Sequence, residues 1–124
     1  MTSHKCDSVI ITCIDFRFQP YIDEWLDKQF KAGSYDRISW AGGIKNLDDV
    51  MEQIGISHRL HCIKNAFLIN HENCGAYGQA ETAEKHAQDL KNAAEEIENK
   101  FPEVEVKTYY LHLDGTFEQI QALT

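Results

Sequence analysis

Two cysteines and a histidine, Cys13, His71 and Cys74, have the types and spacing that best suit a metal site in this chain. Two thiolates and one imidazole form a ligand set suited to zinc, and three protein ligands leave a fourth tetrahedral position open. The His-x-x-Cys spacing lets both side chains turn inward from one tight loop, and Gly75 lets the chain enter the next segment. We therefore expect a mononuclear Zn²⁺ site with Cys13, His71 and Cys74 as metal ligands.

Asp15 and Arg17 follow Cys13 at alternate positions. Alternate side chains of an extended segment point to the same side, so we expect Cys13, Asp15 and Arg17 to share one face of the site. A carboxylate beside zinc accepts a hydrogen bond from metal-bound water or takes the fourth coordination position itself, and an arginine fork holds such a carboxylate in place. Asp15 and Arg17 are therefore the catalytic candidates, with a structural salt bridge as the alternative.

Short apolar segments alternate with amphipathic ones around these residues. The predicted order is strand 8–12, helix from about 20 to 33, strand 37–40, helix from about 46 to 60, strand 66–70, helix from about 76 to 100 and strand 104–113, then a short tail with Phe117, Ile120 and Leu123. This alternation predicts an α/β fold with three αβα layers and a parallel sheet of about four strands in the order 2-1-3-4. We expect one domain over residues 1–124.

The predicted strand order places the metal ligands together. The first and third strands are neighbours in the order 2-1-3-4, and the chain leaves them in opposite directions. Their carboxyl ends then form the crevice in which open α/β sheets bind ligands. Cys13 ends the first strand and His71 follows the third, so both reach this crevice although they are far apart in sequence.

Two predicted helices suggest further packing surfaces. The long helix carries a narrow apolar stripe, made up of Ala76, Ala80, Ala83, Ala87, Leu90, Ala94, Ile97 and Phe101. Such a stripe permits close packing on a sheet or on another helix. The helix after Asn46 is apolar on two sides, because Ile56 and Leu60 lie away from its inner stripe. A partner chain is one way to cover this second side, and we expect a homodimer or a larger homo-oligomer.

Composition restricts the partners and the location that we expect. The net charge of −8 disfavours nucleic acid and anionic membrane surfaces, because both would repel the chain. No apolar run approaches the ~20 residues that a membrane-spanning helix needs. The first residues also lack the apolar stretch of a signal peptide. We therefore expect a cytoplasmic protein that acts on a small molecule and binds neither nucleic acid nor membrane.

The remaining cysteines and histidines attract weaker expectations. In a cytosolic chain, metal binding or burial of cysteines is more common than a disulfide framework. Cys6 and Cys62 are expected to be structural residues or free thiols. His58 and His61 lie three residues apart on a predicted helix beside Cys62, so a second metal site is conceivable. Surface or interface histidines are the expected interpretation, because neighbours at this spacing supply two ligands at most.

At these motifs the sequence resembles the β-class carbonic anhydrases. The resemblance rests on four segments, Cys13-Ile-Asp15-Phe-Arg17, Ala41-Gly42-Gly43, residues 54–60 and His71-Glu-Asn-Cys74-Gly75-Ala76, and it extends over about residues 8–113. It implies that Cys13, His71 and Cys74 bind zinc, that Asp15 and Arg17 are the family dyad, and that the protein is a homodimer. The reaction that it implies is the reversible hydration of carbon dioxide to bicarbonate by a zinc-bound hydroxide. The chain differs from many members of that family at Ser39-Trp40 and at Glu72.

Three alternatives remain open at this point. The first is a zinc-binding protein that is not catalytic, as a structural or regulatory relic of the fold. The second is a related hydrolase of carbonyl sulfide or carbon disulfide, since these are also small linear molecules. The third is a redox sensor that uses the thiols of Cys13 and Cys74 without metal.

Overall fold

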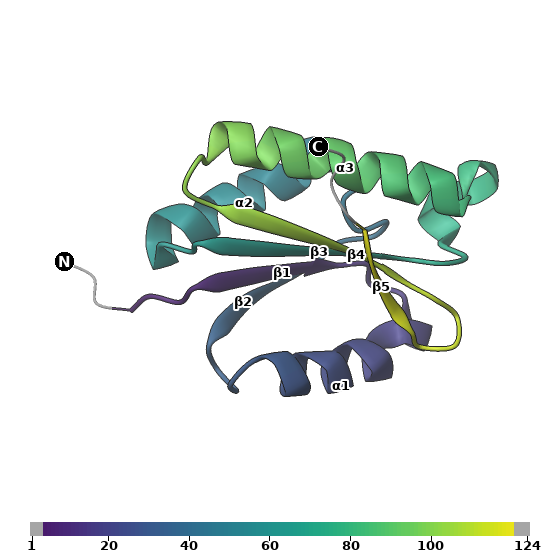
Figure 1. The fold of residues 1–124 in the computed structure, drawn as a ribbon, viewed down its shortest axis with the longest axis horizontal. Coiled ribbons are helices and arrows are strands. Elements are labelled where there is room, and N and C mark those ends of the chain that lie inside the picture. Colours follow the sequence, from purple (N-terminus) through teal and green to yellow (C-terminus); the bar gives the residue numbers. More distant parts are fainter. Residues whose placement is uncertain (1–3, 121–124) are drawn as a thin grey trace.

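The computed structural model of the chain describes residues 4–120 (Figure 1). The strands are β1 (Ser8–Thr12), β2 (Tyr35–Ser39), β3 (Asn65–His71), β4 (Glu105–Leu111) and β5 (Phe117–Ile120). The α-helices are α1 (Gln19–Gln29), α2 (Leu47–His61) and α3 (Ala83–Lys100), and two short 3₁₀ helices, η1 (Phe16–Phe18) and η2 (Gly75–Ala80), follow β1 and β3.

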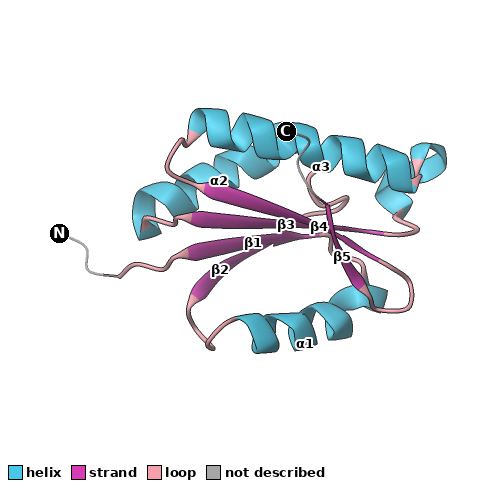
Figure 2. Cartoon of the chain, viewed as in Figure 1, coloured by secondary structure: helices cyan, strands magenta, loops and turns pink. Residues whose placement is uncertain are grey.

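The strands form one sheet in the order β2-β1-β3-β4-β5. β2, β1, β3 and β4 are parallel to their neighbours, which confirms the predicted order 2-1-3-4, and β5 is antiparallel to β4. Figure 2 shows the sheet between two helical layers, with α2 and α3 over one face and α1 over the other. The predicted three-layer α/β class is therefore confirmed.

Each face of β1 contributes to a different core. Val9 and Ile11 pack in the cluster that α2 and α3 cover, whereas Ile10 packs with Ile22 and Leu26 of α1. All five residues of β1 are buried. A strand covered on both faces has no solvent-facing side, which explains why its sequence is a continuous β-branched run rather than an alternating one.

The segment expected as a tail instead forms a fifth strand. Asp114 turns the chain by accepting the Thr116 amide at 2.9 Å, and β5 then pairs with β4. Phe117 stacks on Trp25 of α1, with ring centroids 5.0 Å apart. This aromatic contact fixes a strand that its own four residues signal only weakly. Leu123, which was expected in the same tail, lies outside the described residues.

The long helix expected over residues 76–100 is interrupted. Residues 75–80 form η2, and α3 begins after Thr82, whose hydroxyl accepts the Lys85 amide at 3.0 Å. The predicted stripe is correct at Leu90, Ile97 and Phe101, which are buried. It is wrong at its first three alanines, Ala76, Ala80 and Ala83, which are exposed. The buried face consists of His86, Leu90, Ala93 and Ile97.

Helix α2 is apolar on two sides, as its sequence predicts. Val50 and Ile54 are buried against the sheet, whereas Ile56 and Leu60 are 36% and 44% exposed.

Among the helices that the structure describes, none has the length and the apolar composition needed to cross a membrane.

Candidate zinc site

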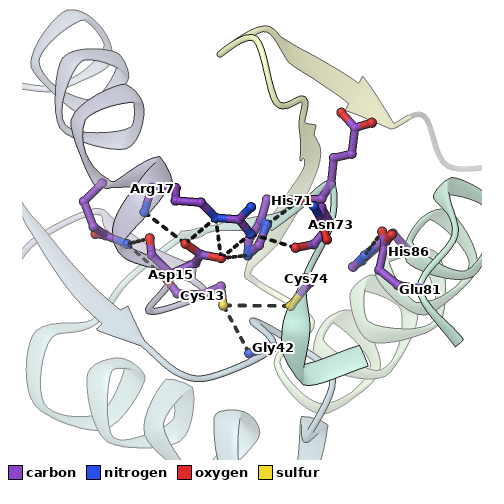
Figure 3. A network of polar contacts seen from close by, with 11 residues as sticks. Cys13, Asp15, Arg17, Gly42, His71, Asn73, Cys74, Glu81 and His86 are labelled. Atoms are coloured by element: carbon purple, nitrogen blue, oxygen red, sulfur yellow. Dashed lines mark hydrogen bonds and ion pairs between the residues drawn. The ribbon is translucent and has the colours of Figure 1, made fainter. Parts of the chain in front are cut away.

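The carboxyl ends of β1 and β3 bring Cys13, His71 and Cys74 together (Figure 3). One potential ligand atom from each residue forms a group whose members all lie within 4.8 Å of one another. The two sulfurs are 4.0 Å apart, and the three residues are at most 5% exposed. The structure thus assembles the three predicted ligands in one buried cluster at the predicted edge of the sheet.

The hydrogen bonds of His71 leave one ring nitrogen suited to a metal. Its Nδ1 lies 2.8 Å from the carbonyl oxygen of Glu72. A carbonyl only accepts hydrogen bonds, so Nδ1 carries a proton and Nε2 is the ring nitrogen that is left to bind a metal. Within residues 4–120, this buried Nε2 has no hydrogen-bond partner. Metal-binding histidines usually have one ring nitrogen held by such a hydrogen bond and the other available to the metal. The donor set therefore fits zinc.

Electrostatics at the cluster favour a thiolate. The hydrogen bond with Cys74, together with His71 and the Gly42 amide, lowers the pKa of Cys13 to about 3 despite the opposing effect of burial. The Gly42 amide donates to the Cys13 sulfur at 3.3 Å. The contact with Cys13 and burial raise the pKa of Cys74, so Cys13 is the thiolate of this pair and Cys74 is the thiol. A divalent cation held by Cys13 and Cys74 would take the place of the proton that lies between the two sulfurs.

The backbone conformation of Gly42 allows its amide to reach the Cys13 sulfur. Its φ of +85° lies in the left-handed region that favours glycine. Its hydrogen bond to the Cys13 sulfur was not foreseen, because the loop after β2 reaches the end of β1 only in three dimensions.

Asp15 and Arg17 form a close pair, although not in the extended segment that we expected. Asp15 caps η1 by accepting the Arg17 amide at 2.9 Å. The Arg17 guanidinium then folds back onto both carboxylate oxygens, with Nη2 2.7 Å from Oδ2 and Nε 3.1 Å from Oδ1. These hydrogen bonds lower the pKa of Asp15 to about 2. The backbone turns because the short Asp15 side chain satisfies an amide at the start of η1.

The Asp15–Arg17 pair also faces the three candidate metal ligands. Oδ2 of Asp15 lies 3.8 Å from Nε2 of His71, although Asp15 does not belong to the cluster of three potential ligands. Arg17 Nη2 donates to the carbonyl oxygen of Asn73 at 2.8 Å. Arg17 of η1 is therefore bound to the loop that joins His71, at the end of β3, to Cys74.

A buried polar network supports the cluster from behind, and sequence reasoning missed it. Tyr77 packs against both site cysteines and donates its hydroxyl to Asp89 at 2.9 Å. Asn70 donates to the Tyr77 hydroxyl at 3.0 Å and lies 3.0 Å from His86 Nδ1. His86 is fully buried, and its Nε2 lies 3.0 Å from a carboxylate oxygen of Glu81. The sequence gives only a weak signal for this network, because most of its members are polar residue types that are usually found at the surface. Only the fold shows that these residues contact one another.

Two large apolar side chains next to Asp15 in sequence are exposed. Ile14 and Phe16 flank Asp15 in sequence and are 58% and 82% exposed. Large apolar side chains with so much exposed surface next to a functional group are typical of an interaction surface.

The comparison with known families agrees with this geometry. A family model described as "Putative carbonic anhydrase" matches residues 3–121. An uncharacterized protein from Rickettsia conorii is 30% identical over 141 aligned positions, which cover 96% of this chain and 74% of that protein. The chain belongs to the β-carbonic-anhydrase-like family, as the motif resemblance predicted.

Solved structures share the fold. The β-carbonic anhydrase isoform I of Trichomonas vaginalis has a TM-score of 0.72 and 18% identity, over 98% of this chain and 88% of that one. A carbon disulfide hydrolase in its apo form has a TM-score of 0.72 and 12% identity, over 97% and 81% of the two chains. Tetrameric β-carbonic anhydrases of Sordaria macrospora have a TM-score of 0.67 and 12% identity, over 98% and 84%. Identities this low establish the fold alone.

Proposed function

We propose that this protein is a zinc-dependent carbonic anhydrase that catalyses the reversible hydration of carbon dioxide to bicarbonate. The observation that carries the proposal is the buried cluster of Cys13, His71 and Cys74, in which His71 Nε2 has no hydrogen-bond partner among residues 4–120. Membership of the carbonic-anhydrase-like family supports the same function. Zinc held by these three side chains supplies a water made acidic enough to act as a nucleophile near neutral pH.

The residues around the cluster would divide the remaining work. Arg17 contacts both oxygens of Asp15, which holds the carboxylate at the edge of the site rather than over the cluster. The ionised oxygens of Asp15 can accept a hydrogen bond from the O–H of the nucleophile and so orient it toward carbon dioxide. The Gly42 amide, by donating to Cys13, tempers the charge of that sulfur and keeps it in position.

A carbon dioxide hydration assay on zinc-loaded protein tests this proposal. Catalysis above the buffer rate, lost when His71 is replaced by Ala, is the expected result. A zinc-loaded protein without activity across neutral and alkaline pH would favour the relic, in which the site binds metal without turnover.

Hydrolysis of carbon disulfide or carbonyl sulfide is the second candidate function. The structural likeness to a carbon disulfide hydrolase favours it, and the apolar side chains of Ile14 and Phe16 suit a substrate without hydrogen-bonding groups. Release of hydrogen sulfide from either substrate, measured beside hydration of carbon dioxide on the same preparation, separates the two activities.

We also propose that the chain acts as one domain in a homodimer or larger homo-oligomer. The exposed Phe16 lies beside the dyad, so a second copy packed there would exclude water from the mouth of the site. A cytoplasmic location and the absence of nucleic-acid and membrane partners remain expectations from charge and composition.

A further inference from the structure

A second group of ligand-type side chains lies near the amino ends of β1 and β2, away from the carboxyl ends that carry Cys13 and His71. It consists of Cys6, Asp36 and His61, and one potential ligand atom from each lies within 4.8 Å of the other two. We propose that these residues form a second binding site for a divalent transition-metal ion, with Zn²⁺ as the preferred ion. The proposal does not depend on the catalytic function, because it concerns other residues at another edge of the sheet.

Backbone contacts bring the three elements that carry these side chains together. Cys6 immediately precedes β1, and its amide donates to the carbonyl oxygen of His61 at 3.0 Å. His61 is the last residue of α2, and Asp36 lies in β2 opposite Val9 of β1. Three separate elements therefore meet at this point, so little rearrangement is needed to bring the ligand atoms to one ion.

Contacts around Asp36 resemble the outer shell of a metal site. Its Oδ2 accepts the Ser57 hydroxyl at 2.6 Å and lies 2.6 Å from Nδ1 of His61. Burial works against ionisation of Asp36, but His61 and Ser57 outweigh it and lower the pKa of this carboxyl. An ionised carboxylate that is already oriented by a hydroxyl is ready to ligate a cation.

The donor types select the class of metal. A sulfur, an imidazole nitrogen and a carboxylate oxygen suit Zn²⁺ and its neighbours among the divalent transition metals, whereas Mg²⁺ and Ca²⁺ prefer oxygen ligands alone. Burial, together with the negative charge of Asp36, raises the pKa of Cys6, so its thiol keeps its proton in the metal-free protein. Binding of the ion therefore releases that proton to solvent as the sulfur–metal bond forms.

Access and charge are also consistent with an ion. A pocket of about 170 Å³ opens onto the three residues and is lined in addition by His4, Lys5, Gly33 and Tyr35. The His4 ring lies edge-on to the His61 ring, with centroids 5.0 Å apart, so His4 or water can complete the coordination. The carboxyl end of α2 attracts a bound cation through the helix dipole, whereas the ammonium of Lys5, which lines the pocket, repels one. We therefore expect this site to bind zinc more weakly than the buried cluster at Cys13.

Titration of the full chain with Zn²⁺ and Co²⁺ tests the proposal. We expect the metal-free parent to bind two equivalents of Zn²⁺ and the Cys6→Ser variant to bind one. Cys62→Ser is the matched control, because Cys62 is next to His61 in sequence, is exposed and does not belong to the group, so this variant should keep both equivalents.

A background without the first site keeps the two sites distinguishable. The double variant Cys13→Ser/Cys74→Ser should bind one equivalent of Co²⁺ with a sulfur-to-metal charge-transfer band, and this band should disappear when Cys6→Ser is added. In the same background, His61→Gln should weaken binding at least tenfold, which provides a test if Cys6→Ser does not fold by circular dichroism. Failure of the folded double variant to bind Co²⁺, or two equivalents of Zn²⁺ bound to Cys6→Ser, would overturn the proposal whether or not the protein hydrates carbon dioxide.

Discussion

Oδ2 of Asp15 lies 3.8 Å from Nε2 of His71, while the same oxygen accepts the Arg17 guanidinium at 2.7 Å. The sequence left two roles open for this carboxylate, orientation of the nucleophile or occupation of the fourth coordination position. In the structure, both carboxylate oxygens are bound by Arg17. This arrangement favours an orienting role for Asp15 and an open fourth position.

The first prediction concerns the Asp15–Arg17 pair. Arg17→Ala should lower kcat/KM for carbon dioxide hydration by about 10–100-fold, because groups that orient the surroundings of a metal have effects of this size. Arg59→Ala, at an exposed position of α2, removes the same charge away from the site and should leave kcat/KM unchanged. Zinc content, measured on both variants, should equal that of the parent. Equal rates for Arg17→Ala and the parent would make the pair a structural salt bridge.

The second prediction concerns Gly43, in the loop after β2. Gly43 has a φ of +63°, and a Cβ at this position would lie 2.3 Å from Oδ1 of Asn70. Gly33 has a similar φ of +75° with no atom within 4 Å of its Cβ position. Ala at either position should therefore cost about 1–2 kcal/mol of backbone strain, and Gly43→Ala should cost a further ~1–3 kcal/mol from overpacking.

Urea unfolding of the parent, Gly33→Ala and Gly43→Ala measures this difference. The two variants have the same chemistry and nearly the same backbone angle, so their difference isolates the contact with Asn70. Equal free energies of unfolding for the two variants would mean that the loop moves aside at no cost.

The third prediction concerns the fully buried His86. Burial holds its pKa below the usual value, so in the folded protein the ring stays neutral where the unfolded chain binds a proton. Stability from this group is fully present above the unfolded pKa of about 6.5 and is lost as pH falls toward the folded pKa. In that window the free energy of unfolding should fall by up to about 1.4 kcal/mol per pH unit from this group alone.

His86→Gln is the variant that tests this effect, because Gln retains hydrogen-bonding capacity and does not titrate. Urea unfolding between pH 8 and pH 5 should show a shallower loss of stability for His86→Gln than for the parent. His112→Gln, at a partly exposed position, is the control for loss of a histidine side chain elsewhere in the chain. Parallel pH profiles for the parent and His86→Gln would show that the buried ring is protonated as readily as the unfolded one.

The extent to which the sequence predicted this structure depends on the range of the interactions. Cys13 and His71 were predicted to meet because two apolar strands end at them, and this pattern is local. The interruption before α3 was missed because alanines continue at helical spacing across Thr82, although a threonine is a good N-cap. Strand β5 was missed because contacts with Trp25 and β4, far away in sequence, hold it in place.

The network of Asn70, Tyr77 and His86 could not be predicted for a similar reason. Nothing in the neighbourhood of His86 distinguishes it from a surface histidine, and the predicted stripe placed alanines on the buried face instead. Its burial depends on a partner from β3 and another from η2, which become neighbours only after the sheet has formed.

The fourth prediction concerns association. We expect a homodimer or a larger assembly by sedimentation equilibrium at micromolar concentration, and Phe16→Ser should shift it toward monomer because Phe16 is 82% exposed. Leu60→Ser makes a similar change on the exposed side of α2. Dissociation by Leu60→Ser alone would move the interface to α2, and a monomeric parent would contradict the prediction.

The central claim is that zinc at Cys13, His71 and Cys74 hydrates carbon dioxide. Stopped-flow hydration rates of zinc-loaded parent and Cys74→Ser, with zinc content measured on the same samples, test it most directly. Cys62→Ser is the control for loss of a thiol elsewhere in the chain. We predict that the parent and Cys62→Ser hydrate carbon dioxide well above the buffer rate and that Cys74→Ser falls to that rate. A zinc-loaded parent no faster than buffer from neutral to alkaline pH, or a Cys74→Ser variant as active as the parent, would contradict the account.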